Sequence, residues 1–187
     1  MSTDPDRSRE VIEVPKGIRF TVTPGRLAAK GPLGAVERPF PSDVLELAVR
    51  EGSVTLTLRV ASERKRSQSL LRTWAAHLRN LAGGLTHGVE ARMKVVAAHF
   101  PMKVSVRGEE LVIENFLGEK FPRTTKLLPG TKAVVEGDIV TLSGHDVEQV
   151  GQSAANVERA THIRDYDPRV FQDGIYLVER AHLKEAN

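Results

Sequence analysis

Six histidines and one short polar cluster are the residues of this chain whose types could support catalysis or bind a metal. The histidines lie at positions 77, 87, 99, 145, 162 and 182, so no two are one helical turn apart, the spacing at which two imidazoles can share a zinc ion. Ser143, His145 and Asp146 are adjacent in sequence, whereas a nucleophilic triad is assembled by the fold. Ser143 is better explained as the cap of a following helix, with Asp146 three residues on. We expect no catalytic residue and no metal site.

Residues 25–31 superficially resemble a loop that holds nucleotide phosphates. In such loops a lysine follows the last glycine and precedes Ser or Thr. Here Lys30 precedes its glycine, and Pro32 stands where the hydroxyl residue is required. A hydrolase would in addition need a convergent polar pocket, which the sequence does not reveal. We therefore expect no cofactor and no small-molecule substrate.

The first group of cations that could neutralise nucleic-acid phosphates lies within residues 119–132. Only Glu119 opposes them, and Pro122, Pro129 and Gly130 predict an irregular stretch between two strands. Loop residues of this kind can follow an RNA backbone. The predicted RNA-binding residues here are Lys120, Arg123, Lys126 and Lys132. The alternative is a solvated loop that is basic without binding.

A second candidate segment lies near the C-terminus. Its predicted RNA-binding residues are Arg164, Arg169, Gln172, Asp173, Gly174 and Tyr176. Gly174 permits a tight turn, and the glutamine amide can reach sugar or base edges. The alternative is a plain turn into a strand over residues 175–178. Asp165, Asp167 and Asp173 favour that alternative, because carboxylates repel phosphates.

A third cluster consists of Arg64, Lys65 and Arg66, placed ahead of a predicted helix that also carries Arg72 and Arg79. A basic run in this position is more typical of a solvated face, so we treat it as a weaker RNA-binding candidate. Stacking platforms for single-stranded bases are not expected, because aromatic residues make up 5% of the chain and Trp74 falls on an apolar helix face. Binding is expected to use the shape and backbone of folded RNA.

The elements that must position these residues recur along the chain. Residues 27–34 (LAAKGPLG) align with 111–118 (LVIENFLG) at an offset of 84, and residues 51–56 align with 136–141 at an offset of 85. Residues 67–70 align with 151–154, again at 84. Three matches in the same order at nearly constant spacing indicate an internal duplication.

Each copy has the pattern of a small antiparallel sheet followed by a helix. Residues 44–49 and 54–60 predict one strand pair, whereas residues 104–106 with 111–113 and 134–135 with 139–142 predict two more. Apolar residues at helical spacing predict helices over residues 70–81, capped by Ser67 and stopped by Gly83-Gly84, and over residues 147–157. The predicted fold class is α+β, with two tandem duplicated domains, each sheet covered on one face by its helix. We expect a disordered tail over residues 1–10, a first repeat over 11–86, and a second over 87–187 with a C-terminal extension.

The composition favours a soluble globular protein. The 187 residues include 40% hydrophobic and 27% charged residues, with no run near the roughly 20 apolar residues that span a bilayer. Cysteine is absent, which fits a reducing compartment. The net charge of +3 divides unevenly: residues 1–86 hold 14 Lys/Arg against 9 Asp/Glu, and the remainder holds 13 against 15. An RNA-binding role therefore depends on local clusters rather than on net charge.

Four segments resemble one known family. Residues 112–123 (VIENFLGEKFPR), 153–161 (SAANVERAT) and 169–176 (RVFQDGIY) resemble the second-domain motifs of the L6 family of large-subunit ribosomal proteins, in its archaeal and eukaryotic form. Residues 30–34 (KGPLG) resemble its first-domain motif, which adds Lys30 as a weaker RNA-binding candidate. Leu33 stands where the family usually has a second lysine, which puts a phosphate contact at that position in doubt. The resemblance spans roughly residues 11–179.

This resemblance implies a two-domain structural protein of the cytoplasmic large ribosomal subunit. The family binds large-subunit rRNA near the sarcin–ricin loop, among neighbouring ribosomal proteins and close to the place where translational GTPases dock. The alternative is a non-ribosomal protein-interaction module that uses exposed sheet edges. Salt dependence separates the two, since RNA binding weakens steeply as salt rises and edge pairing does not.

Overall fold

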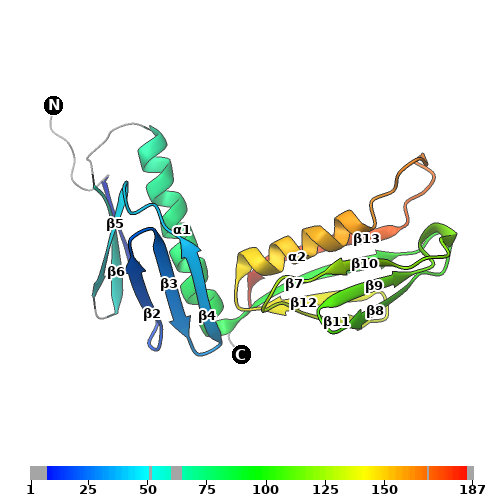
Figure 1. Cartoon of the computed structure of the whole chain (residues 1–187), viewed down its shortest axis with the longest axis horizontal. Helices are drawn as coiled ribbons and strands as arrows, with labels where there is room; N and C mark the ends of the chain where they lie inside the picture. The colour runs from blue at the N-terminus through cyan, green and yellow to red at the C-terminus, as the bar shows by residue number, and fades with distance from the viewer. Residues whose placement is uncertain (1–7, 51, 60–64, 168, 185–187) are drawn as a thin grey trace. The chain divides into compact units, whose positions relative to one another are not determined.

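The computed structural model describes residues 8–50, 52–59, 65–167 and 169–184. The chain forms two compact units, unit 1 (Met1–His87) and unit 2 (Gly88–Asn187) (Figure 1). Of the tail expected over residues 1–10, residues 1–7 lie outside the described part of the chain. Arg9 and Glu10 already belong to the first strand, because they pair with Thr57 and Leu56. Regular structure therefore begins before the expected start at residue 11.

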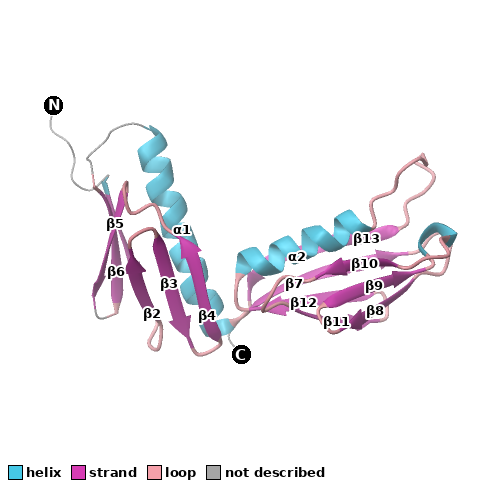
Figure 2. Cartoon of the chain, in the orientation of Figure 1, coloured by secondary structure: helices cyan, strands magenta, loops and turns pink. Residues whose placement is uncertain are grey.

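Unit 1 contains two three-stranded antiparallel sheets and a long helix (Figure 2). Its elements are β1 (Arg9–Glu13), β2 (Arg19–Thr23), β3 (Arg26–Gly31), β4 (Gly34–Pro39), β5 (Leu45–Arg50), β6 (Ser53–Leu58) and α1 (Lys65–His87). The strand orders are β1-β6-β5 and β2-β3-β4. α1 contacts β1 and β6 of one sheet and β3 and β4 of the other, so one apolar helix face closes a core against both.

α1 is longer at both ends than its sequence pattern predicted. It begins at Lys65, so Ser67 is not its cap, and it continues through Gly83 and Gly84 to His87. Each glycine costs a helix interior about 1 kcal/mol relative to alanine. Packing offsets that cost, because Leu85 is fully buried and its carbonyl accepts a hydrogen bond from Leu33 N at 3.3 Å.

Unit 2 contains a four-stranded and a three-stranded antiparallel sheet with a second helix. Its elements are β7 (Val89–Val96), β8 (Lys103–Arg107), β9 (Glu110–Glu114), the 3₁₀ turn η2 (Phe116–Gly118), β10 (Arg123–Lys126), β11 (Lys132–Glu136), β12 (Ile139–Gly144), α2 (Val147–Ala160) and β13 (Gly174–Leu183). The strand orders are β11-β12-β7-β13 and β10-β9-β8. α2 contacts β7, β12 and β13 of the larger sheet and β10 of the smaller one.

α2 begins at Val147, and its cap differs from the predicted one. The Asp146 carboxylate accepts a hydrogen bond from Glu148 N at 3.0 Å, so Asp146 rather than Ser143 is the N-cap. Ser143 lies in β12 and pairs with Glu90 and Lys132. The strand continues to Gly144 because pairing on both sides outweighs the local capping pattern.

The two units share one topology, which supports the duplication. In each, the first, fifth and sixth strands form one sheet, and the second, third and fourth form the other. Leu27 and Leu111 are both the second residue of the equivalent strands β3 and β9, and both are buried. The predicted α+β class is confirmed, with two sheets in each unit instead of the single sheet expected. Unit 2 differs by β13, which pairs with the outer edge of β7.

Candidate nucleic-acid interface

The predicted basic segment over residues 119–132 is more regular than its prolines and glycine suggested. Arg123–Lys126 forms β10 and pairs with β9, with Thr124 opposite Val112 and Thr125 opposite Leu111. Lys132 is the first residue of β11, opposite Ser143. The irregular parts are therefore limited to short stretches on either side of β10. Three of the four predicted cations are consequently held on strands rather than on one flexible loop.

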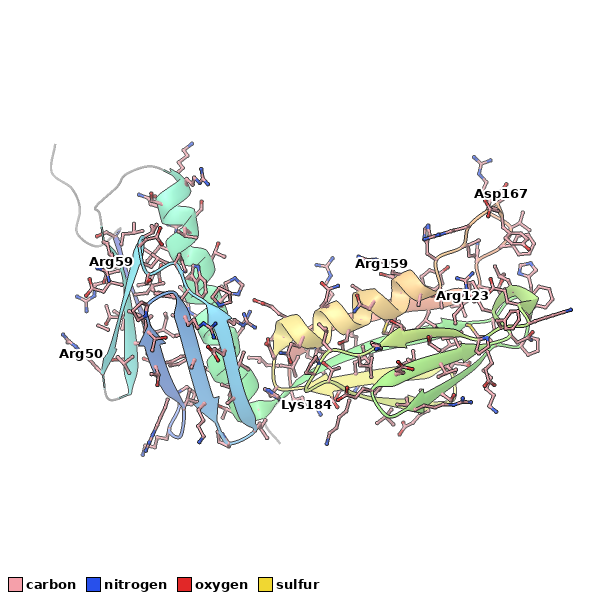
Figure 3. All side chains as sticks on the ribbon, in the orientation of Figure 1. Arg50, Arg59, Arg123, Arg159, Asp167 and Lys184 are labelled. Carbon is pink, nitrogen blue, oxygen red and sulfur yellow. The ribbon has the colours of Figure 1, made fainter. Side chains whose placement is uncertain are left out.

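Arg123 is engaged within the protein. Its Nε and Nη2 donate to the two carboxylate oxygens of Glu119 at 2.9 and 2.6 Å, which lowers the pKa of Glu119. Nη1 donates to the carbonyl oxygens of Ala160 and His162 at 2.9 and 3.2 Å, at the end of α2. The guanidinium also lies 4.2 Å from the centre of the Phe116 ring. This geometry argues against the predicted phosphate contact, because nearly all of its N–H donors are used (Figure 3).

The three lysines of the same segment are exposed. Lys126 Nζ lies 4.0 Å from Glu110, and its side chain is 85% exposed, so this ion pair is weak. Neither Lys120 nor Lys132 has a hydrogen bond or ion pair with any of the described residues. These ammonium groups are available to a polyanion without breaking an internal contact.

Asp173 and Gly174 have structural partners instead of an open surface. The buried Asp173 carboxylate accepts a hydrogen bond from His99 N at 3.0 Å and lies 2.7 Å from His99 Nδ1. Burial by itself raises the pKa of Asp173, but the hydrogen bonds from His99 and from the Ala98 backbone outweigh it and lower the pKa. At Gly174 an added Cβ would lie 3.1 Å from the Tyr176 ring, so the missing side chain lets that ring fold over the strand. Both residues therefore shape the start of β13.

The remaining residues of the C-terminal candidate segment are exposed. Arg164, Arg169 and Gln172 lie on the connection between α2 and β13, where Arg169 N donates to Asp167 Oδ1 at 2.9 Å. Tyr176 is 42% exposed, and its hydroxyl donates to Gln172 O at 3.1 Å. Figure 3 shows Asp167 on the part of this connection that extends beyond the end of α2. The connection thus presents two arginines and an amide to solvent.

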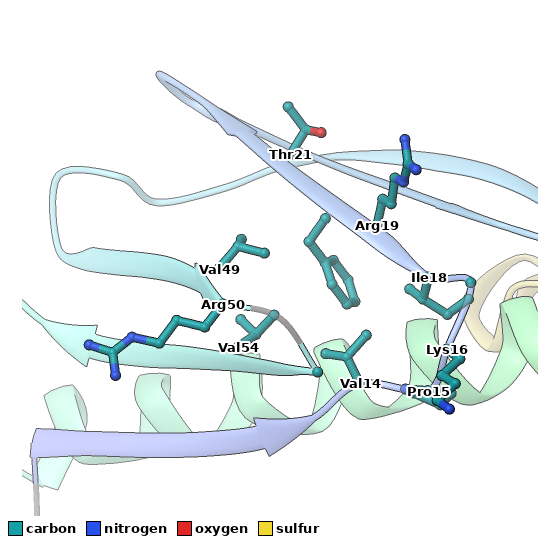
Figure 4. A pocket seen from close by; sticks show the side chains of 12 residues that line it. Val14, Pro15, Lys16, Ile18, Arg19, Thr21, Val49, Arg50 and Val54 are labelled. Carbon is teal, nitrogen blue, oxygen red and sulfur yellow. The ribbon is translucent and has the colours of Figure 1, made fainter.

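The weaker candidates belong to unit 1. Arg64 lies outside the described residues. Lys65 and Arg66 form the exposed first turn of α1 instead of preceding the helix, and Lys30 is exposed on β3. Unit 1 also contains a hollow of about 640 Å³ lined by apolar side chains such as Phe20 and Val54 (Figure 4). The charged ends of Arg19 and Arg50 point away from this apolar lining in Figure 4, so the described residues there do not converge as in a catalytic or phosphate site.

An aromatic group at one end of unit 2 was missed by the sequence analysis. His99 and Phe171 have ring centroids 4.7 Å apart, and Phe171 and Tyr166 have centroids 4.8 Å apart. Phe121 nearby in sequence to Lys120 is 82% exposed. The low aromatic content concealed this group, because two connections about 70 residues apart in sequence contribute to it. A pattern of aromatic residues beside Arg164 and Arg169 was the available signal.

Within the described chain, no helix has the length and apolar character needed to cross a membrane, and no His, Asp and Glu side chains gather in a way that could hold a metal ion. A family model described as Ribosomal protein L6 matches residues 100–174. This match covers most of the candidate interface in unit 2.

Relatives with the name Large ribosomal subunit protein uL6 are similar over both units. The protein of Methanosarcina mazei is 47% identical over 170 residues, covering 91% of this chain and 96% of the relative. That of Methanospirillum hungatei is 46% identical over 171 residues, with coverage of 91% and 96%. That of Methanobrevibacter smithii is 44% identical over 172 residues, with coverage of 92% and 96%. At this identity and coverage, the chain belongs to the ribosomal protein L6 family.

Proposed function

We propose that this protein is a structural constituent of the large ribosomal subunit and binds large-subunit rRNA through unit 2. Its relatives carry the name of a large-subunit protein, and the family consists of structural components rather than enzymes. The single observation that carries the RNA-binding part is the set of exposed cations without internal ion pairs among the described residues, namely Lys120, Lys132, Arg164 and Arg169.

These cations act by replacing the counterions of rRNA phosphates, and no bond is made or broken. β11 fixes the backbone of Lys132, and hydrogen bonds within the α2–β13 connection fix that of Arg169. Fixed positions reduce the entropy lost on binding and select an RNA whose phosphates have a matching spacing. We place the bound rRNA near the sarcin–ricin loop of the cytoplasmic ribosome, among neighbouring ribosomal proteins and close to the docking site of translational GTPases.

Salt dependence of rRNA binding tests the proposal. The double variant K120Q/K132Q should weaken binding of a large-subunit rRNA transcript and reduce the slope of log K against log salt by about 2, since each lost phosphate contact reduces it by about 1. K16Q, which changes an exposed lysine of unit 1 outside all three clusters, is the matched control and should leave the slope unchanged. Equal slopes for wild type and K120Q/K132Q would contradict the proposed contacts.

Cross-linking in purified large subunits tests the location. Cross-links from residues 120–132 should map to the sarcin–ricin region of the rRNA. Cross-links to rRNA confined to unit 1 would refute the assignment to unit 2.

A second candidate function, recruitment of a protein through a sheet edge, is favoured by β13. This ten-residue strand is at the edge of its sheet, and it exposes Val178 (62%) and Leu177 (37%). An exposed edge strand can pair with a strand of a partner. Binding through β13 would persist at high salt and would be lost on substituting Val178 by lysine, whereas the rRNA affinity of K120Q/K132Q would then match wild type.

A further inference from the structure

The aromatic group of unit 2 has one largely open ring at the end of a supported series. The series is His99, Phe171 and Tyr166, with centroid separations of 4.7 and 4.8 Å and ring planes tilted by 34° and 55°. Phe171 is only partly exposed, whereas Tyr166 is 51% exposed. Packing of the connection accounts for Phe171, but it leaves half of the Tyr166 surface without a neighbour. An additional flat ring could extend the series there.

Both ends of this series are held in place. His99 is fixed by the buried carboxylate of Asp173 through contacts of 3.0 and 2.7 Å. On the other side, Asp167 O accepts hydrogen bonds from Val170 N at 3.0 Å and from Phe171 N at 2.9 Å. The base of the same connection is closed by Thr161 Oγ1, which accepts from Ile175 N at 3.0 Å. Tyr166 is therefore presented on a folded support, which lowers the entropy cost of stacking a ligand on it.

The charges around the open ring indicate which ligand would stack. Arg164 and Arg169 are exposed and lie two and three residues from Tyr166. A protein-docking patch would be surrounded by apolar side chains, whereas a nucleotide offers a flat base together with a phosphate on each side. Asp167, the acid next to Tyr166, already accepts from Arg169 N at 2.9 Å, so part of its carboxylate is used within the connection.

We propose that Tyr166 is a base-binding residue that stacks on an unpaired base of the bound RNA, with Arg164 and Arg169 contacting the flanking phosphates. This inference rests on the proposed rRNA binding and adds to it a single-stranded nucleotide as the recognised feature. It also replaces the expectation from composition that no stacking platform exists. A stacked base contributes the equivalent of about 1–3 kcal/mol, which is about a 5- to 150-fold change in affinity.

Affinities of full-length variants for a large-subunit rRNA transcript test the proposal. Y166F keeps the ring and should bind like wild type, whereas Y166L keeps apolar bulk and should bind about 5- to 150-fold more weakly. F121L is the matched control, since Phe121 is exposed but makes no ring contact with the described residues. Wild-type affinity for Y166L would overturn the inference, as would equal weakening by F121L. Loss of Y166L from assembled subunits with unchanged rRNA affinity would indicate a protein contact and would also overturn it.

Fluorescence gives a second readout that loss of folding would not imitate. In the Y166W/W74F protein the only indole is at position 166, because Trp74 is the only tryptophan of the chain. Addition of rRNA should quench its emission if a base stacks on it, and binding without quenching would contradict the proposal. Failure of the proposed function looks different, because wild type itself would then show no salt-dependent binding of rRNA.

Discussion

Arg123 and Lys126 have the same charge and belong to the same strand, but their surroundings differ. Lys126 is 85% exposed, whereas the Arg123 side chain is 27% exposed and contacts Glu119, the end of α2 and the Phe116 ring. Residue type predicted the charge at both positions. It could not predict which cation is used internally, because Ala160 and His162 are almost 40 residues away in sequence.

The internal role of Arg123 predicts a loss of stability on substitution. R123Q should lower the free energy of unfolding by about 2–3 kcal/mol, because hydrogen bonds to charged groups are lost in a partly buried site. K126Q is the control and should change it by less than about 0.5 kcal/mol. Urea denaturation measures both. An R123Q protein as stable as wild type but with a smaller salt slope for rRNA binding would restore Arg123 as a phosphate contact.

The buried carboxylate of Asp173 predicts a pH dependence on the acid side. Its pKa is lower in the folded state than in the unfolded state, so its contribution is present above the unfolded pKa of about 4 and is lost as the pH falls through the folded pKa. The stability difference between wild type and D173N should therefore shrink on acidification below about pH 4. D165N, at an exposed acid of the same connection, serves as the control. A wild type to D173N difference that is constant from neutral to acid pH would contradict this role.

At the scale of elements, local pattern predicted hairpins better than boundaries. The pairs β5–β6, β8–β9 and β11–β12 follow alternation and a glycine turn that lie within about ten residues of sequence. α1 extends past Gly83 and Gly84 because Leu85 packs at Gly31, which is more than 50 residues away. β10 was missed because its pairing with β9 outweighs nearby prolines. Contacts that are distant in sequence thus decide where these elements end.

Close packing at Gly31 predicts that any side chain there is destabilising. An added Cβ would lie 2.5 Å from Ile18 Cδ1 and 2.8 Å from Leu85 Cβ. G31A should therefore lower the free energy of unfolding by about 1–3 kcal/mol, as overpacking does in well-packed cores. Thermal or urea unfolding measures the change. A fully stable G31A protein would show that α1 does not approach β3 this closely.

Gly151 provides the opposite prediction within α2. Its nearest neighbour to an added Cβ is Ala181 Cβ at 3.8 Å, an ordinary contact. G151A should therefore raise the free energy of unfolding by about 0.5–1 kcal/mol, because alanine loses less backbone entropy in a helix interior. The same denaturation experiment applies, and a loss of stability would mean that the space beside β13 is smaller than the structure indicates.

For the molecule as a whole, duplication was predictable and the site was not. Matches at offsets of 84 and 85 residues align strands that do occupy equivalent places in both units. The candidate interface depends instead on what differs between the copies, namely η2 and the connection between α2 and β13. Contacts such as His99 with Asp173, 74 residues apart, have no counterpart in a local pattern. Sequence therefore named the cations of the site but not its aromatic residues.

Separate cores predict that unit 2 folds and binds RNA alone. The buried residues form two clusters, one within unit 1 and one within unit 2. A fragment spanning residues 88–187 should unfold cooperatively in urea and retain the salt slope of the full chain for rRNA. A fragment that folds but binds with a much smaller slope would assign a share of the phosphate contacts to unit 1.

The position of β13 has a consequence for the order of folding during translation. Ile175 is fully buried in the unit 2 core, and β13 pairs along β7 from Gly174 to Leu183. A nascent chain that ends before Gly174 leaves the β7 edge without its partner, whereas every strand of unit 1 has already been made. Unit 1 can thus become native while the ribosome is still adding residues, and unit 2 must wait, with its hydrophobic strands accessible to chaperones, until the last strand emerges from the exit tunnel.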